Sequence, residues 1–243
     1  MGGDLETILN SFGYVGELFR WPLTLSREYP DVTVKYLISM LQLAPDEQKK
    51  LDLVSHFAER FSADREQLTA LLSDTHNRVD YRLYTAFSLH CQQQLGMEDR
   101  EFFYRTARQT FLNYQDRQIR QARYIPLNMV LSGMDWQFKN WTGVTDVTVE
   151  KLKKGAHSFR ITRRTKDKYR QRLAQLLDEE KLSAVLLRDC SFTQAAFEVT
   201  FQELYRQKDL QVKRSKSEGR GDGESEYVII PSSPYKSRTE EYW

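Results

Sequence analysis

The stretch QVKRSKSEGRGDGESEYVII, residues 211–230, decides the fold because it sets two β-prone runs on either side of a glycine-rich loop. Gly219, Gly221 and Gly223 let a long hairpin turn with positive φ at little steric cost. Turn chemistry favours a structural hairpin tip here, and a lid that touches a ligand is the alternative. Residues 211–230 are therefore predicted to form a β-hairpin that closes the fold.

The same loop contains Arg220-Gly221-Asp222, which has the form of a cell-adhesion signal. Adhesion requires an extracellular protein, and residues 1–25 show scattered acids without a basic region followed by an apolar block. The two cysteines, Cys91 and Cys190, lie about 100 positions apart, and we expect both to be free thiols. The longest aliphatic run, residues 184–187, is too short for a membrane span. We expect a cytoplasmic protein.

Apolar residues recur at helical spacing through the first half of the chain. Val34, Leu37, Ile38 and Leu41 occupy positions i, i+3, i+4 and i+7 of one helix face. A later stripe through residues 84–95 ends at Gly96, a common helix stop. Residues 1–30 show no sustained period. We predict an N-terminal extension over 1–30 and a helical half over 31–125.

The second half predicts strands and helices in the order β-β-α-α-β-β. The run VTDVTVEKL and the alternating AHSFRIT, around Phe159 and Ile161, read as two antiparallel strands with a turn at residues 153–155. Two helices follow, the second opened by a capping box at Ser191 and Gln194. The closing hairpin supplies the last two strands.

This order predicts an α+β fold, in which an N-terminal helical half is followed by an antiparallel sheet covered by helices. We assign residues 31–230 to a single domain, with 126–230 as its sheet-bearing half. Residues 231–243, with their prolines, serines and charges, are expected to form a flexible tail.

Four short motifs resemble a known family. The pattern Ser217-x-x-x-Gly221-Asp222-x-x-Ser225, followed by an aromatic and aliphatic strand, resembles the closing hairpin of the 4-vinyl-reductase-like sensor domains. There the typical pattern is Cys-x-x-x-Gly-Asp-x-x-Cys. Similar stretches are Asn77-x-Val79 with Leu95-Gly96, the run FFYRTAR at 102–108, and RDCS at 188–191. The resemblance spans about residues 32–230.

The resemblance implies a bacterial ligand-binding sensor domain. Its wider fold group includes the haem-NO-binding sensors and the TRAPP Bet-type subunits, which tend to pair and to bind a ligand between helices and sheet. Serine at 217 and 225 departs from the family pattern and removes any thiolate metal site, because a hydroxyl is a poor zinc ligand. We expect no output domain after residue 230, and we therefore expect a signal to leave through a partner protein.

Aromatic residues of the second half are the candidate ligand pocket. They converge if the last helix covers the sheet, although most such side chains fill a core. The candidates are Phe138, Trp141, Phe159, Phe192, Phe197 and Phe201. Haem needs an axial ligand facing a pocket, and His90 lies one step off its helix's apolar stripe. The sequence argues against haem and predicts neither a cofactor nor a metal.

A basic segment offers a different function. Residues 151–172 carry ten Lys or Arg and one acid, a local charge of +9 in a chain of net charge +2. Such a field attracts phosphates or nucleic acid. The candidate contacts are Lys151, Lys153, Lys154, Arg160, Arg163, Arg164, Lys166 and Lys168. A solvated basic hairpin with no ligand is the simpler interpretation.

Catalytic motifs for nucleophiles, phosphate loops and metal ligands are missing from the sequence. We therefore predict a non-catalytic sensor or regulatory domain that binds a small hydrophobic ligand, forms a homodimer and signals through a partner protein. The alternative is a nucleic-acid- or anion-binding regulator that uses residues 151–172.

Overall fold

The structure is a computed structural model, and it describes residues 5–12, 32–122, 124–126, 129–133, 145–152 and 158–232. The first half is helical, as predicted, with one two-stranded ribbon. Its elements are α1 (Leu5–Asn10), β1 (Val32–Thr33), α3 (Lys35–Leu41), α4 (Glu47–Arg60), α5 (Arg65–Ser73), β2 (Arg78–Val79), α6 (Tyr81–Leu95), α7 (Asp99–Thr110), the π-helical turn η1 (Phe111–Gln115) and α8 (Asp116–Ala122).

The second half carries the predicted sheet. Its elements are β3 (Thr145–Lys151), β4 (Phe159–Thr165), α10 (Asp167–Ala174), α11 (Glu179–Tyr205), β5 (Val212–Lys216), the 3-10 turn η2 (Glu218–Arg220) and β6 (Ser225–Ile229). The two hairpins join through β4 and β6 in the order β3-β4-β6-β5, and every pairing is antiparallel. The α+β prediction is confirmed.

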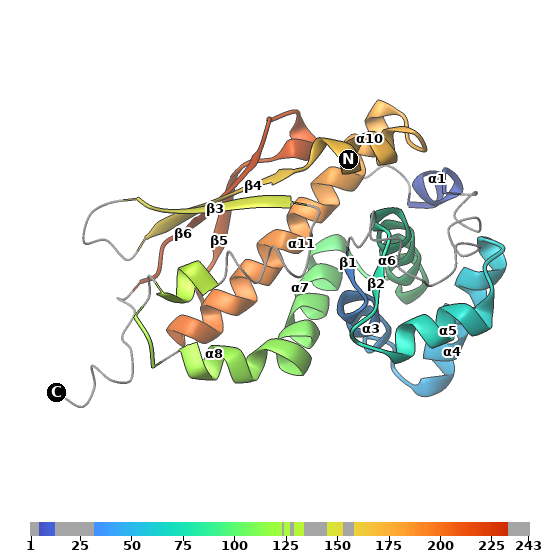
Figure 1. The fold of residues 1–243 in the computed structure, drawn as a ribbon, viewed down its shortest axis with the longest axis horizontal. Coiled ribbons are helices and arrows are strands. Elements are labelled where there is room, and N and C mark those ends of the chain that lie inside the picture. The colour runs from blue at the N-terminus through green and yellow to red at the C-terminus, as the bar shows by residue number, and fades with distance from the viewer. Residues whose placement is uncertain are drawn as a thin grey trace.

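Helix α11 is the central element (Figure 1). It runs diagonally between the four-stranded sheet on one side and α7 and α8 on the other. Phe201 from α11 packs on Phe159 from β4, with ring centroids 4.7 Å apart, and Phe197 packs on Tyr227 from β6. One core thus spans both halves of the chain.

The predicted capping box at Ser191 is wrong. Helix α11 is continuous from residue 179 to 205, and its N-cap is Asp178, whose side chain accepts a hydrogen bond from the Lys181 backbone N–H. Inside the helix, the Ser191 hydroxyl donates to the Leu187 carbonyl four residues earlier. Serine therefore has a second way to satisfy its hydroxyl, which is why a capping pattern within an apolar run misleads.

The N-terminal segment contributes to the core where it is described. Ile8, Leu9 and Phe12 are fully buried, and α1 is tied to α4 and α6 by Glu6, which accepts hydrogen bonds from Arg60 (2.7 Å) and Gln93 (2.6 Å). The domain division stays a prediction, with residues 5–12 packed against the helical half. Residues 233–243, the bulk of the predicted tail, lie outside the described residues.

The glycines of the closing hairpin have different roles. Gly221 adopts φ +91°, as turn chemistry predicts. Gly219 has no room for a side chain, because a Cβ there lies 2.3 Å from the backbone nitrogen of Leu187 in α11. The hairpin tip therefore packs directly against α11.

Candidate functional site

Two adjoining hollows lie where α3 and α6 of the helical half meet α11. The larger leaves about 30 Å³ for the centre of a water-sized molecule, and the smaller about 20 Å³. Tyr84, Asp189 and Phe192 line both. The larger is also lined by Val32, Tyr36, Tyr81, Thr145, Val147, Arg163, Thr193, Ala196 and Phe197. We refer to the two hollows together as the interhalf cavity.

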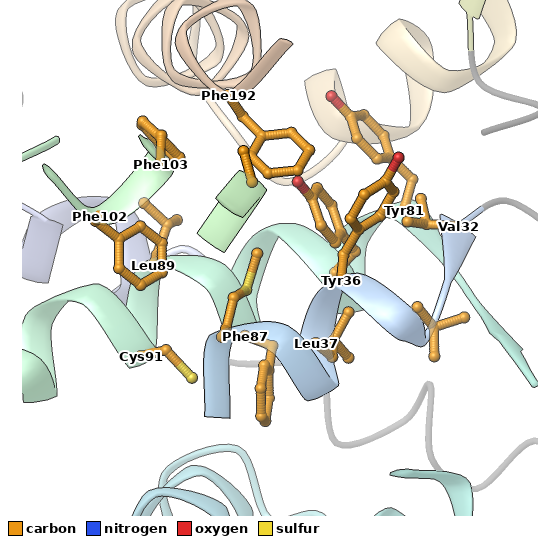
Figure 2. Close-up of a cluster of buried hydrophobic side chains, with 14 of the residues drawn as sticks. Val32, Tyr36, Leu37, Tyr81, Phe87, Leu89, Cys91, Phe102, Phe103 and Phe192 are labelled. Carbon is orange, nitrogen blue, oxygen red and sulfur yellow. The ribbon is translucent and has the colours of Figure 1, made fainter. Parts of the chain in front are cut away.

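Aromatic side chains form one wall of the interhalf cavity. In Figure 2 the rings of Tyr36 and Tyr81 point from the helical half toward α11, and Phe192 points back from α11 toward them. Tyr36 and Phe192 meet edge to face, with ring centroids 5.0 Å apart, and Tyr84 lies 6.5 Å from Phe192. Such contacts hold the aromatic rings in place and leave the tyrosine hydroxyl groups at one end of the cavity.

An ion pair forms the polar end of the cavity. Arg163 donates a hydrogen bond to Asp189, and the side chains are only 7% and 11% exposed. Tyr81 donates to the same carboxylate oxygen at 3.2 Å. Burial opposes the charge on Arg163, but Asp189 together with the smaller contributions of Tyr227, Cys190 and Tyr81 outweighs it and holds the pKa of the guanidinium well above its usual value.

A second carboxylate stands behind Arg163. Glu218 from η2 is almost fully buried, and one of its oxygens lies 3.9 Å from Arg163. Its carboxylate accepts hydrogen bonds from the Thr165 backbone N–H (2.9 Å) and hydroxyl (3.1 Å). The guanidinium thus faces two carboxylates, one on α11 and one in the closing hairpin.

Secondary-structure periods explain why these charges are inside. On β4 the inward positions alternate, so Arg163 shares the core face with Phe159 and Ile161. On α11 Asp189 lies three residues before Phe192 and seven before Ala196, which places all three on the cavity face. In the sequence, Arg163 stands out only as part of the basic segment, although the alternation along β4 already indicates that its side chain is buried.

The predicted pocket residues separate in the structure. Phe192 and Phe197 line the interhalf cavity, whereas Phe159 and Phe201 pack against each other in the core under the sheet. Phe138 and Trp141 lie outside the described residues. Four residues that line the cavity were not predicted as site residues, because nothing in the order of the elements along the chain places α3 and α6 opposite α11. They are Tyr36, Tyr81, Tyr84 and Asp189.

The basic segment does not form one cationic surface where the structure describes it. Arg163 is buried, and Arg160 pairs with Glu226 at 3.2 Å. Arg164 pairs with Asp167 and Lys166 with Asp146. Lys168 lies over the ring of Tyr169, 4.8 Å from its centroid. Lys153 and Lys154, and the side chain of Lys151, lie outside the described part of the chain.

The motif positions of the closing hairpin come together with Cys190. The Cys190 thiol lies 2.9 Å from the Ser225 hydroxyl, which also accepts a hydrogen bond from the Glu218 backbone N–H. Both cysteines are buried and free, as predicted. No group of three or more His, Cys, Asp or Glu side chains among the described residues could hold a metal ion.

His90 is a buried structural residue of the helical half. Its Nε2 lies 3.1 Å from the Leu53 carbonyl and its ring packs edge to face on Phe57. Burial lowers the pKa of His90 to about 4. It lies on α6 away from the interhalf cavity, whose described lining contains no histidine.

The pKa of His90 predicts a pH dependence of stability. Because the pKa lies below its unfolded value of about 6.5, the neutral ring stabilises the fold above that pH. This contribution is lost as pH falls toward 4, and the loss is on the order of 3 kcal/mol. Between pH 7 and pH 4.5, we expect the free energy of unfolding of His90→Gln to fall by about 2 kcal/mol less than that of wild type. Urea unfolding at the two pH values measures the difference. His76→Gln, at a 90% exposed side chain, is the control. Equal losses for His90→Gln and wild type would contradict the assignment.

Comparison with solved structures identifies the fold. The chain is similar to an oxygen-binding H-NOX domain related to soluble guanylate cyclases, in its oxygen complex, with a TM-score of 0.52 and 11% identity over 83% of this chain and 93% of that one. It is similar to the Fe(II) unliganded H-NOX protein from K. algicida, with a TM-score of 0.52 and 10% identity over 83% of this chain and 97% of that one. No family model matches the sequence, and no curated protein matches it significantly.

These likenesses correct one prediction. The sequence argued against any cofactor, haem included, and that prediction is wrong for this fold, because the similar structures are H-NOX domains and one is described in its Fe(II) state. Haem would need far more space than the interhalf cavity leaves between its described lining residues. A volume of about 30 Å³ is far below that of a pocket for a drug-sized ligand, about 300–1,000 Å³. In this shape the described lining residues do not fit haem.

The comparisons leave other sequence predictions open. The resemblance to 4-vinyl-reductase-like domains and to TRAPP Bet-type subunits stays a prediction. Within the described residues, the structure has no helix long and apolar enough to span a membrane. At these identities the likeness concerns the fold alone: this chain has the fold of the H-NOX sensor domains, with an Arg–Asp pair and tyrosines between its two halves.

Proposed function

We propose that this chain is a non-enzymatic sensor domain that binds a small molecule in the interhalf cavity and signals through a partner protein. One observation carries the proposal: the cavity is walled by the helical half through Tyr36 and Tyr84, and by α11 and the sheet through Phe192 and Arg163. A molecule held there contacts both halves at once. The likeness to an oxygen-binding H-NOX domain supports a ligand-binding role for a chain of this fold.

The fold provides a route from the cavity to the surface. Arg163 at the cavity faces Glu218 of the closing hairpin, and Gly219 of the same turn packs on the α11 backbone. The hairpin tip at residues 220–223 is exposed. A ligand that moved the Arg163–Asp189 pair would therefore alter the support of an exposed loop. A cytoplasmic location and a homodimer built through the N-terminal helices belong to this proposal.

Filling the cavity tests the proposal. Ala196 lines the cavity from α11, so Ala196→Leu places an isobutyl group in the ligand space, whereas neighbouring Ala195 does not line it. We expect native mass spectrometry of gently purified wild type, incubated with a metabolite extract, to detect a bound molecule that denaturation releases. We expect Ala196→Leu to carry no bound molecule and Ala195→Leu to carry as much of it as wild type does.

The same measurement reports the oligomeric state. Wild type without a bound molecule, or Ala196→Leu with as much as wild type, would contradict the proposed function. The nucleic-acid alternative has no comparable observation in its favour, because the described candidate contacts from Arg160 to Lys168 are buried, paired with carboxylates or stacked on a ring.

A further inference from the structure

The interhalf cavity contains a polar group that lacks a partner. Tyr84 is 6% exposed and lines both hollows, and its hydroxyl makes no hydrogen bond with any described residue. Among the described residues, this hydroxyl does not belong to the fully enclosed side-chain atoms that lack a hydrogen bond, so it borders open space in which a small molecule can accept a hydrogen bond from it. Burial, followed by the nearby Asp189 carboxylate, raises the pKa of Tyr84 well above its usual value. The hydroxyl therefore stays protonated and is available as a donor.

Asp189 provides a complementary acceptor. It also lines both hollows. One carboxylate oxygen, Oδ2, receives the hydrogen bonds of Arg163 and Tyr81, while Oδ1 receives none from the described residues. A free donor and a free acceptor thus border the same small space. A ligand that carries an acceptor next to a donor satisfies both.

The charges around the cavity select against ions. Arg163 is held by Asp189 on one side and Glu218 on the other, so these three side chains sum to one negative charge. An anion entering the cavity would meet that excess or displace Asp189 from a buried pair. A cation would compete with Arg163 for the same carboxylate. An uncharged molecule can shift the pair without replacing either partner, and it avoids the cost of burying a further charge.

The size of the cavity limits the occupant to a few non-hydrogen atoms. The larger hollow has room for about two water molecules, and Tyr84, Asp189 and Phe192 line both hollows. We propose that the interhalf cavity binds a small uncharged amide-like molecule, whose carbonyl oxygen accepts from Tyr84 and whose N–H donates to Asp189. This inference rests on the proposed function and names the chemical class of its ligand.

Three molecules of the same planar shape test the class, namely acetate, acetamide and acetamidinium, which differ in charge. We expect titrations followed by protein NMR to show acetamide binding at least about tenfold more tightly than either ion. Tyr84→Phe, which removes only the hydroxyl, is expected to weaken acetamide binding about fivefold to tenfold. Tyr104→Phe is the control, because the Tyr104 hydroxyl donates to Gln202 outside the cavity.

The outcomes separate the ligand class from the proposed function. Equal or tighter binding of acetate or acetamidinium overturns the uncharged class, and so does unchanged acetamide binding in Tyr84→Phe. If none of the three binds while wild type carries a molecule that Ala196→Leu lacks, the amide class is wrong and the sensor site stands. If the Ala196→Leu experiment also fails, both proposals fall.

Discussion

Replacing Gly219 with alanine is expected to destabilise the protein by about 3 kcal/mol or more. A Cβ at this position lies 2.3 Å from the Leu187 nitrogen, 2.5 Å from its Cα and 2.6 Å from its Cβ. Two of these atoms are backbone atoms inside α11, which cannot move aside as the end of a flexible side chain can. The hairpin tip has to separate from α11, and Glu218 then loses its place beside Arg163. Urea unfolding at neutral pH measures the change.

The other glycines of the hairpin are matched controls. Gly223 has open space around it and no positive φ, so Gly223→Ala is expected to change stability by less than about 0.5 kcal/mol. Gly221 has open space but φ +91°, so Gly221→Ala is expected to cost about 1 kcal/mol through backbone strain alone. If Gly219→Ala is no worse than Gly221→Ala, then the tip does not pack on α11 as described.

Removing the cation of the cavity is expected to have an effect of similar size. Arg163→Met removes the positive charge beside Asp189 and Glu218, whose side chains are only 11% and 1% exposed. Loss of one partner of a buried pair costs about 3–5 kcal/mol, because the remaining charge has no water to solvate it. The double variant Arg163→Met with Asp189→Leu removes both charges and is expected to recover at least half of that loss.

The neighbouring residue on β4 is the control for this experiment. Arg164 has a 59% exposed side chain and pairs with exposed Asp167, so Arg164→Met is expected to cost less than about 1 kcal/mol. Additive losses in the double variant would show that Arg163 and Asp189 do not act as a pair. Chemical denaturation of wild type, Arg163→Met, Asp189→Leu and the double variant under one set of conditions measures the coupling.

The hairpin glycines show how far sequence reasoning reaches. Turn chemistry correctly indicated that Gly221 needs a left-handed backbone, because φ preference is a property of the residue itself. It did not distinguish Gly219, whose requirement comes from a helix more than thirty residues earlier in the chain. The capping box at Ser191 failed for a related reason, since α11 is held as one helix by packing on both sides.

Sequence alone determined the local periods of this protein: the helical first half, the antiparallel strands and the paired hairpins, because these follow from side-chain spacing and turn chemistry. Only the tertiary structure decided which residues meet at the cavity. Tyr36 and Tyr84, from α3 and α6, reach Asp189 and Arg163 because α11 lies between the two halves. Contacts between distant segments depend on how layers pack against one another, and no local pattern in the chain encodes that arrangement.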